Sequence, residues 1–262
     1  MTRIAVIGVQ NVGKSSLINA LMSDPQRQVA SRIVSEIPGT TRDSSDTVIR
    51  HEGQDYLFID TAGLRRKARV EEDIEYFSNM RSIQAIAHCD IAILVLDASQ
   101  PVSKQEKRIA KMAVDEGKGL ILLVNKADLL KADARKERRA ELEIALPFCR
   151  FAPVLFTSAA TREQLPKVFP LIETVRRNRL RRIPMKELRN WFEGAIQRLP
   201  SMELSRSKHL TQAEDVPPTF VLFVKRASAV PASHLRALEN SMRQTFAFEG
   251  TPLTFITKDS RE

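Results

Sequence analysis

Residues 8–15, with the sequence GVQNVGKS, have the composition and spacing of a loop that binds polyphosphate. The pattern GxxxxGK[ST] lets backbone N–H groups wrap around phosphate oxygens, and the helix expected to follow adds its dipole charge. Lys14 is predicted to reach the β- and γ-phosphates, and the Ser15 hydroxyl to bind Mg²⁺. The residues predicted to contact phosphate are Gly8, Gln10, Asn11, Val12, Gly13, Lys14, Ser15 and Ser16.

A second group of residues is predicted to surround the γ-phosphate. Asp60 and Gly63 belong to the segment DTAG at the end of an expected strand. The Asp60 carboxylate would hold Mg²⁺ through water, and the Gly63 N–H would contact the γ-phosphate. The segment PGTTRD, residues 38–43, lies between this motif and the phosphate loop. Thr41 is the first choice there for a threonine that binds Mg²⁺ and senses the γ-phosphate, and Thr40 is the second.

The segment NKAD, residues 125–128, predicts that the bound base is guanine. The Asp128 carboxylate can accept hydrogen bonds from guanine N1–H and from the 2-amino group, whereas adenine offers neither and would leave the carboxylate poorly paired. Asn125 is expected to approach the base and to steady the phosphate loop, and the Lys126 stem to cover the base. Ser158 and Ala159 fit a loop whose backbone N–H contacts guanine O6. The expected ligands are therefore GTP and GDP with Mg²⁺.

The elements that must position these motifs form an α/β pattern. Short apolar segments alternate with helical ones through residues 1–182, and the motifs fall where strands end. The runs Ile91–Val95 and Leu120–Val124 are apolar at every position, so both of their faces need cover. We therefore predict a P-loop GTPase domain over residues 1–182, with a mostly parallel sheet and helices on either side.

A different order follows the arginine-rich stretch that ends at residue 182. Helical spacing over Met185–Leu199 precedes two strand-like segments, a second helical segment over Ala232–Phe248 and a last strand-like segment. The order α-β-β-α-β predicts a small α+β domain over residues 183–262. Trp191, the sole tryptophan, is expected to pack in this domain rather than to stack on a base.

The composition points to a partner with negative charge. The 262 residues carry a formal net charge of +9, and arginines cluster near residues 65–66 and 176–182. The two cysteines, Cys89 and Cys149, are far apart, which excludes a disulfide scaffold and favours core positions. No apolar stretch reaches the roughly 20 residues that a membrane span needs. A cytoplasmic protein with no membrane partner is expected.

Beyond these motifs, three C-terminal segments carry a family resemblance. They are RIP at 182–184 with LRNW at 188–191, PPTFVLF at 217–223, and FEGTPL at 248–253. Together with the ordered nucleotide motifs, they resemble EngA, also called Der, within the Era/EngA/MnmE group. That family has two tandem GTPase domains followed by a KH-like domain. This sequence is similar to the second GTPase domain and the KH-like domain nearly end to end, and it looks like a shortened form that lacks the first GTPase domain.

The resemblance implies a switch in maturation of the large ribosomal subunit, with ribosomal RNA or the ribosome as the partner of the KH-like domain. This agrees with the basic clusters, because attraction to phosphates is the sequence-independent part of RNA binding. DNA is not expected as a partner. The KH-like region shows no GXXG loop, so the usual KH clamp on single-stranded RNA is not expected.

The residue after the DTAG segment, Leu64, bears on the mechanism. Ras-like enzymes place a water-orienting glutamine there, and leucine cannot do that work. The resemblance points to a group that instead uses K⁺ near the β- and γ-phosphates, held by the position that Asn11 occupies. The expected catalytic residues are Asn11, Lys14, Thr41 and Gly63, and the expected metal ligands are Ser15, Thr41, Asp60 and Asn11.

Two other functions stay open on the sequence. A tRNA-modifying GTPase of the MnmE type would need a folate-binding domain and a C-terminal cysteine, and the chain shows neither. A nucleotide-dependent RNA-binding scaffold with negligible hydrolysis is left open by Leu64. A hydrolysis assay with and without ribosomal subunits separates the enzyme from the scaffold.

Overall fold

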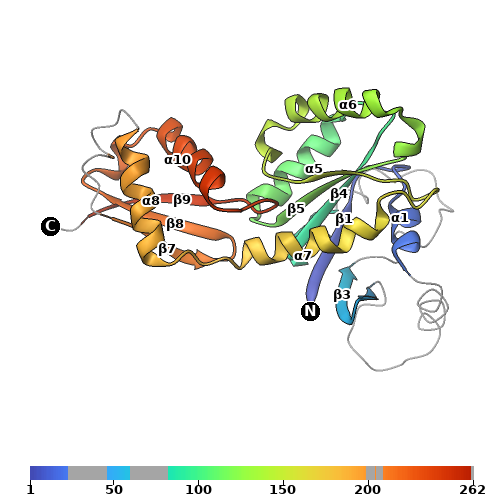
Figure 1. The fold of residues 1–262 in the computed structure, drawn as a ribbon, viewed down its shortest axis with the longest axis horizontal. Helices are drawn as coiled ribbons and strands as arrows, with labels where there is room; N and C mark the ends of the chain where they lie inside the picture. The colour runs from blue at the N-terminus through green and yellow to red at the C-terminus, as the bar shows by residue number, and fades with distance from the viewer. Residues whose placement is uncertain (23–45, 60–81, 199–203, 205–208, 261–262) are drawn as a thin grey trace. The chain divides into compact units, whose positions relative to one another are not determined.

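The computed structural model describes the chain outside residues 23–45, 60–81, 199–203, 205–208 and 261–262. It divides into two compact units, Met1–Glu173 and Thr174–Glu262 (Figure 1). The division falls inside helix α7 (Val168–Arg179). The expected domain boundary after residue 182 therefore stays a prediction, and each unit is described by itself.

Unit 1 is built on a six-stranded sheet with the order β2-β3-β1-β4-β5-β6. All neighbouring pairs are parallel except β2 with β3, which form an antiparallel hairpin. The expectation of a mostly parallel sheet is confirmed. The strands are β1 (Thr2–Ile7), β2 (Thr47–His51), β3 (Gln54–Ile59), β4 (Ile91–Asp97), β5 (Gly119–Asn125) and β6 (Val154–Phe156).

The two central strands explain why unit 1 folds in this way. Six residues of β4 and all seven of β5 are buried, so the sheet is covered on both faces, as the apolar runs predict. One face packs against Ile109, Ala110 and Ala113 of α5 in a common core, which also contains Cys89 and Cys149. The expected core positions of both cysteines are confirmed. Among the residues that the structure describes, the unit contains α1 (Lys14–Leu21), α5 (Lys104–Asp115), α6 (Ala132–Ala145), the first part of α7 and a helical segment at residues 82–88, with short 3₁₀ turns η1 (Ala127–Leu129), η2 (Pro147–Cys149) and η3 (Leu165–Lys167).

Local signals set the ends of α5. The Ser103 hydroxyl accepts a hydrogen bond from the Glu106 N–H at 3.1 Å, and the Glu106 carboxylate accepts one from the Ser103 N–H at 2.7 Å. This reciprocal capping box satisfies backbone donors at the start of the helix. The helix ends at Asp115, two residues before Gly117, which adopts a φ of +63° and so terminates the helical backbone.

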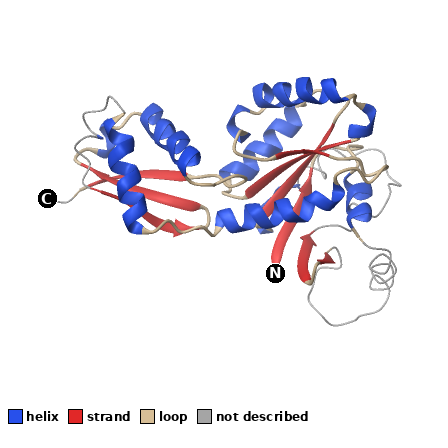
Figure 2. Ribbon diagram, in the orientation of Figure 1, coloured by secondary structure: helices blue, strands red, loops and turns tan. Residues whose placement is uncertain are grey.

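Unit 2 has the order α8 (Met185–Gln197), β7 (His209–Asp215), β8 (Pro218–Val224), η4 (Ala227–Ala229), α10 (Ala232–Thr245) and β9 (Thr254–Asp259) (Figure 2). Strand β8 is central, antiparallel to β7 and parallel to β9. The expected α-β-β-α-β order is confirmed. Trp191 is 8% exposed and lies in the core of this unit with its ring 6.1 Å from that of Phe246, so its packing role is confirmed as well.

The C-terminal half of α7 holds a loop of unit 2. The Asn178 amide donates to the Glu249 carbonyl at 2.9 Å, and Arg243 donates to the carbonyls of Phe248 and Thr251 at 3.0 Å each. Gly250 lies between them at a φ of +76°. A Cβ at this position would overlap the Val175 side chain, so the close approach to α7 requires glycine.

Candidate nucleotide-binding site

The phosphate loop connects β1 to α1 through a backbone path that needs glycine at two positions. Gly8 has a φ of +144° and Gly13 a φ of +94°. A Cβ on Gly8 would overlap the Val95 carbonyl oxygen, and a Cβ on Gly13 would overlap the Asn125 amide. Asn11 also has a positive φ of 61°, a conformation that asparagine adopts more readily than most residues. The loop is therefore shaped by its own sequence before any ligand binds.

The Lys14 ammonium lies over this loop. It donates hydrogen bonds to the carbonyls of Gly8 at 2.9 Å and Val9 at 2.5 Å. Burial lowers the pKa of Lys14 to about 8, although the negative charge of Glu106 opposes this shift. A phosphate beside the ammonium would offset the cost of burying its charge. The position of Lys14 thus fits a polyphosphate ligand.

The other residues predicted to contact phosphate lie at the start of α1 or in the loop before it. Helix α1 begins at Lys14, directly after Gly13, so the positive end of its dipole and the side chains of Ser15 and Ser16 are at the loop. Val12 is buried, whereas Gln10 and Asn11 are exposed. The predicted γ-phosphate residues Thr40, Thr41, Asp60 and Gly63 lie outside the described residues.

Asn125 joins the phosphate loop to the base-binding region. It ends β5 and is only 2% exposed. Its amide donates to the Val12 carbonyl at 2.8 Å, and its side-chain oxygen accepts from the Ala159 N–H at 3.1 Å. The Ala159 N–H, expected to contact guanine O6, thus already binds the Asn125 side chain in this structure. The role of Ala159 toward the base stays a prediction.

The structure adds Asp97, which the motifs do not include. Asp97 ends β4 in register with Asn125 and forms an ion pair with Lys126 at 2.6 Å. Burial alone would raise the pKa of Asp97, but hydrogen bonds from Lys126 and Ser99 outweigh it and lower the pKa. Lys126 itself has a φ of 62°. Because parallel strands end at one edge of the sheet, the carboxylate at the end of β4 can be placed beside this contact only once the strand order is known.

The remaining residues that are predicted to bind the base lie on two loops. Asp128 is in η1 and is exposed, so its carboxylate is open to a ligand. Ser158 is fully buried, and its hydroxyl accepts a hydrogen bond from the Thr161 N–H at 3.1 Å. The structure therefore brings those predicted phosphate-binding and base-binding residues that it describes together around Asn125.

A glycine-shaped phosphate loop between the first strand and first helix of a mostly parallel sheet, with NKAD two strands away, defines a P-loop GTPase fold. Residues 3–126 match the family described as 50S ribosome-binding GTPase. Residues 182–258 match the KH-domain-like family of EngA bacterial GTPase enzymes, C-terminal. The chain belongs to the EngA/Der family.

Relatives of the chain support this assignment over nearly its whole length. It is 41% identical over 266 residues to GTPase Der of Agathobacter rectalis, covering 99% of this chain and 59% of that protein. It is 42% identical over 264 residues to GTPase Der of Heliobacterium modesticaldum, covering 98% of this chain and 58% of that protein. The chain thus spans less than two thirds of these relatives. Among solved structures, Era in complex with MgGDPNP and 16S ribosomal RNA is similar at a TM-score of 0.49 and 15% identity, covering 100% of this chain and 94% of that one.

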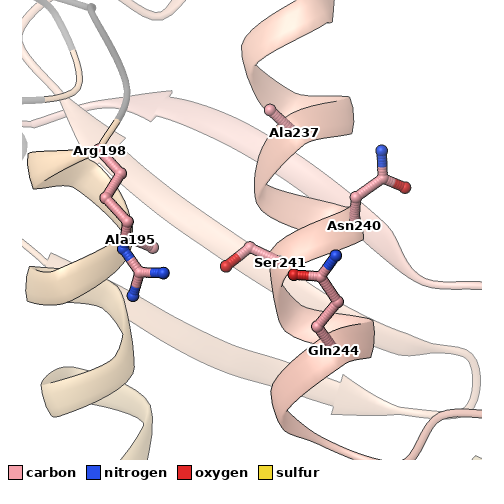
Figure 3. Close-up of a pocket in the computed structure, with 6 residues that line it drawn as sticks. All are labelled: Ala195, Arg198, Ala237, Asn240, Ser241 and Gln244. Atoms are coloured by element: carbon pink, nitrogen blue, oxygen red, sulfur yellow. The ribbon is translucent and has the colours of Figure 1, made fainter.

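Unit 2 carries a pocket of about 280 Å³ between α8 and α10 (Figure 3). The lining residues are Ala195, Arg198, Ala237, Asn240, Ser241 and Gln244. Figure 3 shows the Arg198 guanidinium turned toward Ser241 and Gln244, while its Nε donates to the Gly194 carbonyl at 3.0 Å. An arginine, two amides and a hydroxyl are groups that bind phosphates and base edges.

Within the described ranges, no helix is long and apolar enough to cross a membrane.

Proposed function

We propose that the protein is a guanine-nucleotide switch that hydrolyses GTP to GDP and phosphate. The observation that carries the proposal is the placement of Asn125. This buried side chain binds the Val12 carbonyl on the phosphate loop and the Ala159 N–H on the second base loop. One ligand with a polyphosphate at one end and guanine at the other would occupy both regions.

The described residues fit such a ligand. Lys14 would exchange its two carbonyl partners for phosphate oxygens, and backbone N–H groups at the start of α1 would bind the same phosphates. Ser15, with Thr41 and Asp60, would hold Mg²⁺, which neutralises charge on the β- and γ-phosphates. Asp128 would accept hydrogen bonds from the guanine edge.

Titration with GDP, IDP and ADP tests the base assignment. GDP is expected to bind most tightly, and IDP more weakly because inosine lacks the 2-amino group that Asp128 accepts from. In the Asp128→Asn variant the new amide can donate, so the preference should move from GDP toward XDP, whose base carries a carbonyl at that position. Equal affinity of the parent protein for GDP and ADP would refute the proposal.

We infer that hydrolysis depends on K⁺ through Asn11. Leu64 cannot orient the attacking water, so further positive charge near the phosphates is needed to stabilise the transition state. The exposed, left-handed Asn11 lies in the phosphate loop, where its side chain could hold a monovalent cation. Turnover in KCl should exceed turnover in NaCl for the parent, and Asn11→Ala should remove the difference. If GDP binds but no condition gives turnover, the protein acts as a nucleotide-dependent scaffold.

We further propose that unit 2 binds ribosomal RNA and that the switch acts in large-subunit biogenesis in the cytoplasm. The support is the net charge of +9, the match of residues 3–126 to a family described as 50S ribosome-binding, and the polar pocket with Arg198. Co-sedimentation with large subunits, and not with small subunits, is expected in the GTP-analogue state.

The salt dependence of binding tests the contribution of Arg198. A plot of the logarithm of the RNA-binding constant against the logarithm of salt concentration has a negative slope. Arg198→Ala should make this slope shallower by about one if the side chain contacts a phosphate. Arg150→Ala is the matched control, because it removes the same charge from an exposed position in unit 1. Equal slopes for parent and Arg198→Ala would place the RNA contact elsewhere.

A further inference from the structure

An ion pair between Arg135 and Glu163 spans two segments of the candidate site. Arg135 lies in α6, and Glu163 lies in the loop that follows β6. The two terminal nitrogens of the guanidinium contact the two carboxylate oxygens at 2.6 and 3.0 Å. This two-point geometry fixes direction as well as distance, as a single contact would not.

The same pair also holds the backbone of both base-binding loops. The Nη2 atom of Arg135, besides contacting Glu163, donates a hydrogen bond to the carbonyl of Ala127 at 2.8 Å, and Ala127 directly precedes Asp128. The Glu163 carbonyl accepts from the Ser158 N–H at 3.2 Å. The ion pair therefore links the residue beside Asp128 to the Ser158-Ala159 segment.

The loop that contains Glu163 needs such a restraint. Arg162 and Gln164, on either side of Glu163, have positive φ values of 62° and 59°. Left-handed backbone is unfavourable for residues with a Cβ, and two such positions in one short loop favour other conformations unless contacts oppose them. The contacts of Glu163, together with an Arg162 hydrogen bond to the Ala20 carbonyl at 3.1 Å, oppose that tendency.

The charges around the pair are consistent with a fixed geometry. The hydrogen bond to Glu163 raises the pKa of Arg135, and the nearby charges of Glu163 and Asp128 add to this rise. The hydrogen bond from Arg135 in turn lowers the pKa of Glu163. The Asp128 carboxylate is thus close enough for its negative charge to act on both members of the pair.

We propose that Arg135 and Glu163 are positioning residues that hold the two base-binding loops in register, and that they thereby strengthen the selectivity for guanine and slow the release of GDP. This inference rests on the proposed function. It assigns the pair no contact with the nucleotide. Its effect passes through the Ala127 carbonyl to Asp128 and through the Ser158 N–H to Ala159.

The test compares Arg135→Met and Glu163→Gln with Arg50→Met. Arg50 pairs with Asp55 at 2.7 and 3.0 Å in the β2–β3 hairpin, at the opposite edge of the same sheet, so it controls for loss of a two-point ion pair in unit 1. Both test variants should release GDP about three- to tenfold faster than the parent. Their preference for GDP over IDP should fall by a similar factor, while Arg50→Met leaves both quantities unchanged.

Amide hydrogen exchange measured without nucleotide tests the inference independently of GDP binding. The N–H groups of Ala127 and Ser158 donate to Thr157 and Glu163, and they should exchange faster in the two test variants only. Unchanged exchange and unchanged GDP release would overturn the inference. If the parent does not bind GDP, the proposed function fails, and the exchange rates still decide whether the pair orders the loops.

Discussion

Gly13→Ala is expected to damage the phosphate loop through one identified contact. Gly13 has a φ of +94°, and the added methyl would overlap the Asn125 Nδ2 atom. That atom is not at the end of a mobile side chain, because Asn125 is 2% exposed and its amide donates to the Val12 carbonyl at 2.8 Å. The methyl group must therefore displace a buried amide and break a hydrogen bond between two parts of the site.

The expected magnitude has two components. Left-handed backbone with a Cβ costs about 1–2 kcal/mol. Displacing the hydrogen-bonded amide of Asn125 costs about 1–3 kcal/mol more. Gly13→Ala should therefore lower the free energy of unfolding of unit 1 by about 2–5 kcal/mol. Gly53→Ala is the matched control: Gly53 has a φ of +78°, but no atom lies within 4 Å of its added Cβ, so only the backbone cost applies.

Native-state hydrogen exchange of the β1 and β4 amides measures this difference. Tryptophan fluorescence does not suit it, because Trp191 belongs to unit 2. The excess cost of Gly13→Ala over Gly53→Ala should disappear in an Asn125→Ala background, where the overlapping atom is gone. Equal costs for the two glycine variants in the parent background would refute the role assigned to Asn125.

Two further predictions concern other buried sites. Burial raises the pKa of the Cys149 thiol from an ordinary 9.0 to about 12. Above pH 9.0 the thiol therefore keeps its proton in the native state but loses it in the unfolded chain. The free energy of unfolding should consequently fall as the pH rises toward 12. Urea unfolding at about pH 8 and about pH 10 should show this loss in the parent and less of it in Cys149→Ala; identical losses in both would contradict it. Gly250→Ala should destabilise unit 2 by about 2–5 kcal/mol, because a positive φ and overlap with Val175 combine. Trp191 fluorescence during urea unfolding reports on this unit, and an unchanged midpoint would rule out the tight contact.

Much of the fold follows from residue patterns alone. The apolar runs of β4 and β5 predict buried parallel strands because no polar face is left for solvent. Element ends are harder to predict. The helical spacing over Glu163–Arg177 predicts a single helix there, but Glu163 lies in a loop, η3 begins at Leu165, and α7 continues to Arg179. The reason is the left-handed backbone beside Glu163, which tertiary contacts maintain against local preference.

In the candidate site too, local sequence patterns predict some of the residues and miss others. Residues of the phosphate loop and the NKAD segment are adjacent in sequence, so a local pattern is enough to find them. The contacts that support them are not local: Lys126 meets Asp97, and Arg135 meets Glu163, across separations of 29 and 28 residues. A pattern search has no reason to pair these residues, because their proximity depends on strand order and on the path of α6.

The site is held from two sides, and this has a consequence for nucleotide exchange. Asn125 binds the loops from within the protein, where its hydrogen bond to the Val12 carbonyl is buried and its bond from the Ala159 N–H is partly buried. Arg135 and Glu163 bind them from a half-exposed position, with side chains 28% and 32% exposed. Opening the base loops breaks the Asn125 contact with the Ala159 N–H but leaves its buried hydrogen bond to the Val12 carbonyl intact, and the outer pair can separate first at lower cost. GDP could thus leave by release of the base while the phosphate loop stays ordered, and faster release in Arg135→Met with unchanged protection of the Val12 region would distinguish this order of events from collapse of the whole site.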